Sequence, residues 1–447
     1  MSMNRRDFLK VGLSSLAYFT IEATTPKWVM RAAQALPLSC LTNGRILVIL
    51  QQSGGNDGLN TLIPRSDDIY YDGATRPTIR IPKGEDLMLD SLNGLHPKMP
   101  DIAEWFHKGH AAAFQCVGYA NPDFSHFTST DYWETGSVPG QMMPKTGWVS
   151  RFFDNQCDGH GAVNPLSMVS TGISSVPDML SGSETYVPPA ISSFSKYKLN
   201  ASLDRTQRLA AITSMNNLPV VDTNIDFLQR SYNTVEASAA DIAEAAKMQQ
   251  IAPATYTNDS LGNGLKMASQ IIRAGFDTRI FYVYQGGYDT HANQVASADP
   301  INGGDHQRLL GNLNQNINSF LYEMQESQNL DRVMVLTFSE FGRRIKENAS
   351  FGTDHGAANV MFAFGGGLNA GIYGGQPDML DSHTIKGNLR NNLDFRSIYS
   401  AVIERWFGAQ AAPVFGQDAY DSIITPELAK LNFIREKAAV KNWQHYR

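Results

Sequence analysis

The sequence is poor in cysteine, in charge and in long apolar runs, and each shortage argues against a class of protein. Three of its 447 residues are cysteines, Cys40, Cys116 and Cys157, and none is part of a CxxC pair. This argues against a disulfide scaffold and a thiolate zinc site. Charged residues make up 18% of the chain, too few for a disordered protein, and no stretch reaches 18 uninterrupted apolar residues. We therefore expect a folded protein with no membrane span.

The remaining composition is that of an acidic globular protein. Hydrophobic residues account for 42% of the chain, and the 37 basic and 43 acidic residues give a formal net charge of −6. An acidic balance does not favour a nucleic-acid-binding face, so no nucleic-acid partner is expected.

The first 35 residues have the pattern of an export signal. Paired arginines at positions 5 and 6 precede Phe-Leu-Lys and a mildly apolar run, and Ala-Gln-Ala at 33–35 forms a small-x-small cleavage site. We interpret residues 1–35 as a twin-arginine signal peptide rather than an amphipathic helix. The partners would then include the twin-arginine translocation machinery, and the mature protein would be periplasmic or extracellular. The segment carries five basic and two acidic residues, so the remaining chain has a formal charge of −9.

Residues 36–447 alternate between buried strands and amphipathic helices. Apolar runs typical of strands buried on both faces occur at 45–51, 111–117, 165–170, 278–284, 333–338 and 358–364. Helical periodicity occurs at 97–110, 128–135, 148–153, 261–274, 306–326 and 395–407. The alternation predicts an α/β domain with a mostly parallel sheet covered by helices on both faces. A loop is expected over about 171–197, and a helical insertion over about 200–250.

Polar side chains cluster at the ends of the predicted strands. Five turns carry them, in chain order Asp57; Ser125 and His126; Asp289 and His291; Ser339 and Glu340; Asp354 and His355. Each turn alone has an ordinary explanation, because Gly and Asp suit turns and Ser caps helices. Together they fall where an open α/β sheet binds its ligands, and mixed carboxylate and imidazole groups suit divalent metal ions. We therefore predict a metal site at this edge.

A serine nucleophile is a natural complement to such a site. Ser125 stands where a helix begins, and a hydroxyl at a helix N-terminus beside a metal suits phosphoryl or sulfuryl transfer. His126 is left open as a ligand, a proton donor or a packing neighbour. Arg343 or Arg344 could bind an anionic group, although a salt-bridged surface arginine is the preferred interpretation. His306 is interpreted as a packing or capping histidine.

Five segments resemble the DUF1501 family, a commonly exported group related to the alkaline phosphatase/sulfatase superfamily. They occur in the family's order and are LQQSGGNDGLNT (50–61), SHF with DYWETG (125–136), GYDTHANQ (287–294), TFSEFGR (337–343) and GTDHG (352–356). The resemblance covers essentially the whole chain after the signal.

The resemblance implies a three-layer α/β/α sandwich with one or two divalent metal ions, Zn, Mn, Mg or Ca. It implies Ser125 as the nucleophile, and as metal ligands Asp57, Asp289, His291, Glu340 and His355. Ser339-Glu340 stands where the superfamily has an aspartate followed by His or Asn, which weakens the case for a second metal. No cysteine stands at the nucleophile position, which disfavours a sulfatase with a cysteine-derived formylglycine.

Two functions follow from this site. The first is an exported metal-dependent hydrolase that uses Ser125 on small anionic substrates, namely phosphate, phosphonate or sulfate esters. The second is a non-catalytic exported protein that retains the fold for binding, transport or assembly, with the polar strand ends as remnants or as a structural metal site. The retained Ser, Asp and His positions favour the hydrolase, and the departure at Ser339-Glu340 favours the alternative.

Overall fold

The computed structural model describes residues 41, 43–157, 164–183, 186–197, 238–296 and 299–435, with Ser214 and Thr234. All of them belong to the unit Ser39–Arg447. The expected signal peptide and most of the expected insertion lie outside the described residues; of the insertion, residues 238–245 are helical. Within the described ranges, no helix is long and apolar enough to cross a membrane.

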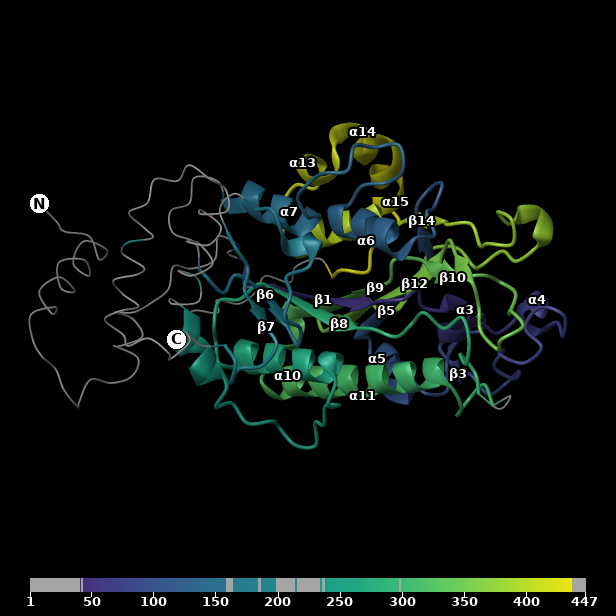
Figure 1. The fold of residues 1–447 in the computed structure, drawn as a ribbon, viewed down its shortest axis with the longest axis horizontal. Helices are drawn as coiled ribbons and strands as arrows, with labels where there is room; N and C mark the ends of the chain where they lie inside the picture. The colour runs from purple at the N-terminus through teal and green to yellow at the C-terminus, as the bar shows by residue number, and fades with distance from the viewer. Residues whose placement is uncertain are drawn as a thin grey trace, which may run out of the picture. The chain divides into compact units, whose positions relative to one another are not determined.

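A nine-stranded mixed sheet forms the centre of the domain (Figure 1). Its strands are β1 (Ile46–Gln52), β5 (Ala111–Gly118), β6 (Met168–Thr171), β7 (Ala190–Ile191), β8 (Ile280–Gln285), β9 (Val333–Phe338), β12 (Asn359–Gly365), β13 (Gly371–Tyr373) and β14 (Leu393–Asp394). Their order is β13-β5-β12-β9-β1-β8-β6-β7, with β14 also beside β5. Every pairing is parallel except those of β12, which is antiparallel to β5 and β9. The expected mostly parallel sheet is confirmed.

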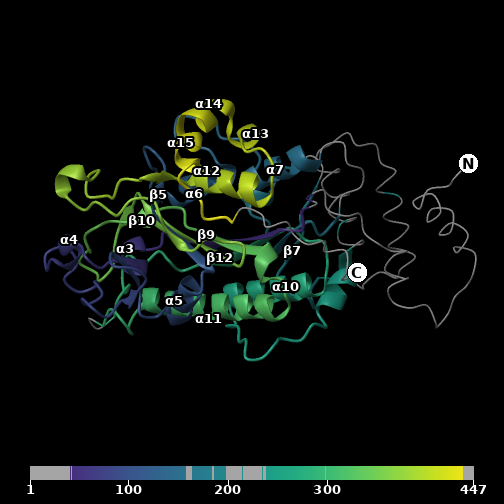
Figure 2. The same cartoon turned by 180° about the vertical axis from the view of Figure 1, so that it is seen from behind.

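Helices cover both faces of this sheet, as Figures 1 and 2 show from opposite sides. One face carries α5 (Pro100–His107), α10 (Ser260–Arg273) and α11 (Asp305–Glu326). The other carries α6 (His126–Thr135), α7 (Trp148–Cys157), α12 (Phe395–Ala401), α13 (Ala412–Phe415), α14 (Gln417–Ala419) and α15 (Thr425–Leu428). The three-layer architecture is thus confirmed.

Strand β1 shows why its residues Ile46–Leu50 are apolar at every position. Ile46, Val48 and Leu50 belong to the core under α10 and α11, whereas Leu47 and Ile49 belong to the core under α6, α7 and α12. Alternate side chains point to opposite faces, and both faces are covered, so no position of the strand can be polar without a partner.

Shorter elements surround the edge of the sheet where β1, β8 and β9 end. They include α3 (Gly58–Thr61), α4 (Asp68–Tyr71), and a small sheet of β2 (Leu62–Pro64), β3 (Leu87–Met88) and β4 (Asn93–Leu95). Strands β10 (Gly342–Arg343) and β11 (His355–Gly356) pair antiparallel and set Arg343 opposite His355. The expected loop at 171–197 contains the 3₁₀ turn Asp178–Leu180 and β7, which pairs with β6 as an additional strand.

The direction of β12 matters for the site. Because β12 runs against its neighbours, its first residue lies at the edge where β1, β8 and β9 finish. The turn that precedes β12 therefore joins the turns that follow the parallel strands. This brings His355 to the same edge as Asp289.

Candidate metal centre

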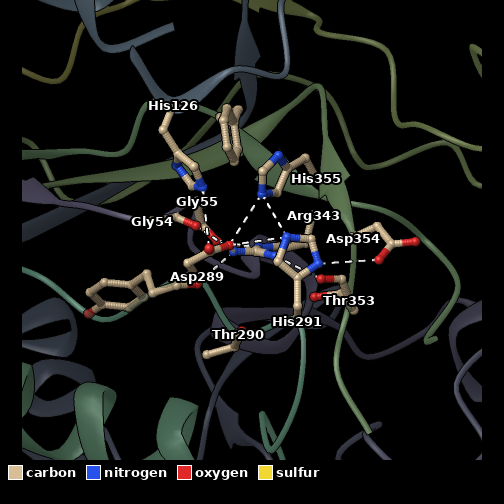
Figure 3. A network of polar contacts seen from close by, with 12 residues as sticks. Gly54, Gly55, His126, Asp289, Thr290, His291, Arg343, Thr353, Asp354 and His355 are labelled. Atoms are coloured by element: carbon tan, nitrogen blue, oxygen red, sulfur yellow. Dashed lines mark hydrogen bonds and ion pairs between the residues drawn. The ribbon is translucent and has the colours of Figure 1, made fainter. Parts of the chain in front are cut away.

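Three histidines converge on the carboxylate of Asp289 (Figure 3). The Nε2 atoms of His291 and His355 each lie 3.2 Å from Asp289 Oδ1, and His126 Nε2 lies 3.4 Å from Oδ2. The two nitrogens His291 Nε2 and His355 Nε2 are 2.8 Å apart. Ligand atoms of His126, Asp289 and His355 all lie within 4.8 Å of one another, so these three side chains could hold a metal ion.

The opposite nitrogen of each ring faces an oxygen acceptor. His126 Nδ1 lies 2.8 Å from Glu340 Oε1, and His355 Nδ1 lies 2.8 Å from the carbonyl oxygen of Phe124. His291 Nδ1 lies 3.3 Å from Asp354 Oδ1. An acceptor at Nδ1 favours a proton there, which leaves Nε2 as the lone-pair nitrogen in a neutral ring. All three rings are therefore set in the tautomer that binds metal through Nε2.

The donor set fits a divalent ion. Three Nε2 lone pairs that face one carboxylate repel it unless a proton or a cation lies between them. His126 Nε2 is buried and makes no hydrogen bond to the described residues. Ligands about 2.1 Å from a tetrahedral ion lie about 3.4 Å apart, close to the measured 3.2 and 3.4 Å from the imidazoles to Asp289.

Arg343 holds the carboxylate of Asp289 in place. Its guanidinium donates to Asp289 Oδ1 at 2.8 Å and to the carbonyl oxygens of Gly55 at 2.6 Å and Thr353 at 2.7 Å, and also to that of Gly54. Burial raises the pKa of Asp289, but the hydrogen bond and the positive charge of Arg343 oppose it, and the pKa is lowered to about 2. The interpretation of Arg343 as a surface residue was wrong, because its side chain has no exposed area. Arg343 is salt-bridged as expected, but its partner is Asp289 of the cluster.

Glu340 lies behind His126. Its carboxylate is buried, and Oε1 accepts hydrogen bonds from His126 Nδ1 and from the backbone N–H of Gly54, both at 2.8 Å. The hydrogen bond to Glu340 raises the pKa of His126, although burial opposes it. Glu340, predicted as a ligand, thus contacts a histidine of the cluster and orients its ring.

Asp57 is not brought into the cluster. Its side chain is buried, and both carboxylate oxygens accept from Arg76, at 2.7 and 3.1 Å. Oδ2 also accepts from Gln294 at 2.6 Å, and Oδ1 caps α3 at the N–H of Asn60. Burial raises the pKa of Asp57, but the Arg76 charge outweighs it, so the pKa lies below its usual value. The residue expected to bind metal is engaged instead by a guanidinium.

Ser125 is the N-cap residue of α6 and directly precedes His126. It is exposed, and its backbone N–H donates to Asp123 Oδ1 at 2.6 Å. Its hydroxyl makes no hydrogen bond to any described residue, including those of the cluster. The structure thus sets Ser125 next to the cluster in sequence, with its hydroxyl open to solvent.

A cavity of about 420 Å³ adjoins the cluster. His126, Asp289 and Glu340 line it from one side, together with Gln51, Ser53, Gly54, Phe127, Thr130, Asp131, Tyr284 and Gly287. These lining residues include three carboxylates and no lysine or arginine. An anionic ligand would therefore depend on a bound cation and on hydrogen-bond donors.

His126 is the site residue that the sequence left undecided. Ser125 and His126 are adjacent, and a pattern of residue types cannot show which of them points to the cluster. The helix begins one residue after Ser125, so His126 occupies its first turn and points at Asp289 (Figure 3). The available signal was a histidine at the start of a helix that follows a buried strand.

The chain belongs to the family described as protein of unknown function (DUF1501), whose model matches residues 45–397. The matched range contains every residue of the cluster. No curated protein matches the chain.

Solved structures that are similar to this chain at low identity include alkaline phosphatase and sulfatase types. A protein of the alkaline phosphatase superfamily from Vibrio parahaemolyticus is 10% identical, with 93% of this chain and 78% of that chain covered and a TM-score of 0.39. The PsFucS1 sulfatase from a Pseudoalteromonas species is 12% identical, with 97% and 78% covered and a TM-score of 0.34. A phosphonate monoester hydrolase from Silicibacter pomeroyi is 8% identical, with 89% and 78% covered and a TM-score of 0.33.

Proposed function

We propose that the protein is a metal-dependent hydrolase of phosphate, phosphonate or sulfate esters. The observation that carries the proposal is the convergence of three histidine Nε2 atoms on Asp289, each ring held by an acceptor at Nδ1. His126, Asp289 and His355 would hold one divalent ion, with His291 beside them. Asp57 is left out of this ligand set because Arg76 occupies its oxygens.

Residues of the chain would supply the nucleophile and would hold the metal ligands in place. A divalent ion in this site would supply positive charge to polarise an anionic ester. Ser125 Oγ, exposed and without a hydrogen bond to the described residues, would act as nucleophile at the N-cap of α6. Arg343 would hold Asp289 in its ionised form, and Glu340 would hold His126 in its metal-binding tautomer.

We also propose that the protein is exported by the twin-arginine route. The support is the sequence pattern of residues 1–35. Twin-arginine cargo crosses the membrane folded, which suits a site whose ligands come from distant parts of the chain.

One observation favours a second candidate, an exported binding or assembly protein with a structural metal. Two of the five expected ligands, Asp57 and Glu340, have their oxygens engaged by other groups of the protein. A site with fewer ligands than expected suits a structural ion as well as a catalytic one.

Metal content and turnover, measured on one preparation, separate the two candidates. The purified mature protein would be assayed on aryl phosphate monoesters and diesters, a phosphonate monoester and an aryl sulfate. The hydrolase proposal predicts about one divalent ion per chain and turnover that falls by about a thousandfold or more in Ser125→Ala. Ser129→Ala, on the same helix but buried, is the matched control.

The outcomes are distinct. Turnover that Ser125→Ala leaves unchanged would remove the serine mechanism. Bound metal without turnover on any of these esters would favour the structural role. Absence of bound metal after incubation with Zn²⁺, Mn²⁺, Mg²⁺ or Ca²⁺ would contradict the hydrolase and the structural metal, and would leave a binding or assembly protein whose polar strand ends are remnants.

A further inference from the structure

A buried hydrogen-bonded chain leads from the cavity wall into the core. The Tyr282 hydroxyl lies 2.6 Å from Gln51 Oε1 and 3.0 Å from Glu134 Oε1. Gln51 is on β1, Tyr282 is on the adjacent β8, and Glu134 is on α6. All three side chains are buried, and Glu134 Oε2 also accepts from the backbone N–H of Met179 at 3.1 Å.

The Tyr282 hydroxyl cannot donate to both oxygens, because a phenol has one proton. When Glu134 is protonated, it donates to Tyr282, which then donates to Gln51 Oε1. An ionised Glu134 can only accept a hydrogen bond, so the Tyr282 hydroxyl then donates its hydrogen bond to Glu134 instead of to Gln51. The Gln51 amide must then rotate, so that its NH₂ group donates to the tyrosine oxygen. The two amide orientations have nearly the same shape, so packing does not prevent the exchange.

The other end of the Gln51 amide faces the cavity. Gln51 lines the cavity, and its Nε2 atom donates no hydrogen bond to the described residues. With Glu134 protonated, the cavity therefore meets an N–H donor. With Glu134 ionised, it meets a carbonyl oxygen at the same place. A donor binds an anion with a charge-assisted hydrogen bond, whereas a carbonyl oxygen repels it.

We propose that Glu134 and Tyr282 are positioning residues that set the polarity of Gln51, so that Gln51 donates to an anionic ligand only while Glu134 carries a proton. The anionic character of the ligand rests on the proposed function. The coupling of the three side chains does not, because it follows from the number of protons available to them.

The surroundings of Glu134 place this exchange near neutral pH. Burial raises the pKa of Glu134 to about 7, and the hydrogen bonds from Tyr282 and from the Met179 N–H oppose that effect. The other titratable groups that face it are Asp178 on the 3₁₀ turn, which raises its pKa further, and Tyr399 on α12. The donor form is therefore expected below about pH 7, and the acceptor form above it.

Sulfate binding tests the effect on an anion, since sulfate keeps its charge across the range used. Glu134→Gln cannot ionise; its NH₂ donates to Tyr282 and its oxygen accepts from Met179, as in the protonated chain. The two proteins should bind sulfate equally at pH 5.5. Above pH 7 the wild type should bind about tenfold or more weakly than the variant, the effect of one hydrogen bond to a charged group. Parallel pH profiles would overturn the proposal.

The orientation of the amide can be read directly from ¹⁵N-glutamine spectra. The side-chain signal of Gln51, assigned as the one missing in Gln51→Met, should shift between pH 5.5 and 8.5 in the wild type. It should stay at its acid position in Glu134→Gln and lose its pH response in Tyr282→Phe. Asp131→Asn, which removes another carboxylate of the cavity, should leave the response in place.

These readouts separate the inference from the proposed function. A Gln51 signal that does not respond to pH, in a protein that hydrolyses esters, would overturn the coupling alone. A signal that responds as expected, in a protein that does not bind sulfate at any pH, would overturn the anionic ligand and leave the coupling. Thermal unfolding of each variant would verify that it is folded.

Discussion

Glu340 contacts His126 at Nδ1 while Asp289 faces the same ring at Nε2, so the ring lies between two carboxylates. We predict that Glu340→Gln weakens metal binding by about 10–100-fold, because a neutral amide oxygen is a weaker acceptor than a carboxylate and no longer increases the basicity of the ring. Competition with a metal-sensitive dye would measure the change. Glu104→Gln, which removes an exposed carboxylate paired with Lys108, should leave affinity unchanged. Equal affinity in Glu340→Gln would show that the negative charge of Glu340 does not strengthen the metal binding of His126.

The buried ion pair of Arg76 and Asp57 leads to two separate predictions, one on protein stability and one on metal content. Removing one partner leaves an unpaired buried charge, so Arg76→Met should lower the free energy of unfolding by about 3–5 kcal/mol. Denaturant unfolding would measure this change in the free energy of unfolding.

Because Arg76 occupies both oxygens of Asp57, we expect Asp57→Asn to keep its metal content. Loss of metal in Asp57→Asn would instead show that Asp57 is a ligand, as the family resemblance implies.

Residue types in strand-end turns indicate which side chains can gather, but not what each one contacts. The structure brings Asp289, His291 and His355 together, and these lie in turns that the sequence singled out. The role of Arg76 was not foreseen, because the path of the loop between positions 57 and 76 leaves no periodic signal. The same holds for Arg343, whose burial depends on the backbone carbonyls around it.

At the scale of the elements, the turn after β1 packs directly against the turn after β8. Gly54 has a φ of 123°, and a Cβ there would lie 2.2 Å from the backbone N of Asp289. We predict that Gly54→Ala displaces Asp289, weakening metal binding by about tenfold or more and destabilising the fold by about 1–3 kcal/mol. Metal titration and thermal unfolding would measure the two effects.

Gly73→Ala is the matched control for this change. Nothing lies within 4 Å of a Cβ at Gly73, so its metal affinity and stability should remain those of the wild type. Wild-type affinity in Gly54→Ala would contradict the close packing of the two turns.

Long periodic elements were predicted closely, and short or edge elements were not. The helices expected at 261–274 and 306–326 are observed at Ser260–Arg273 and Asp305–Glu326. Their apolar stripes face a sheet, which leaves a clear period of 3.6. Strand β7 has two residues and is held by its pairing with β6, so no local pattern indicates it. The reversed direction of β12 was also not visible, because an apolar strand reads the same in either direction.

At the scale of the whole molecule, Glu134 gives stability a pH dependence. Its folded pKa of about 7 lies above its value of about 4.5 in an unfolded chain, so the folded state holds the proton more tightly. Its contribution is fully present below about pH 4.5 and is lost as pH rises through 7. We predict that Glu134→Gln removes this loss and is the more stable protein by about 2–3 kcal/mol at pH 8, relative to the difference at pH 4.

Denaturant unfolding of both proteins across this range would measure the effect. A constant difference between wild type and Glu134→Gln from pH 4 to pH 8 would contradict it. Glu404→Gln, which changes a carboxylate bonded to Tyr420 away from the core, serves as the control.

The antiparallel course of β12 has a consequence for the order in which the protein matures. His126 meets Glu340 across 214 residues of sequence, and His355 meets the carbonyl of Phe124 across 231. No fragment that ends before β11 contains His355, and the ring has its place only once β11 and β12 have paired with their neighbours. Ion capture should therefore be among the last events of folding, slow to begin because such distant segments must first meet. A nascent chain that ends before His355 would lack one of the three ligands and so could not form the complete metal site.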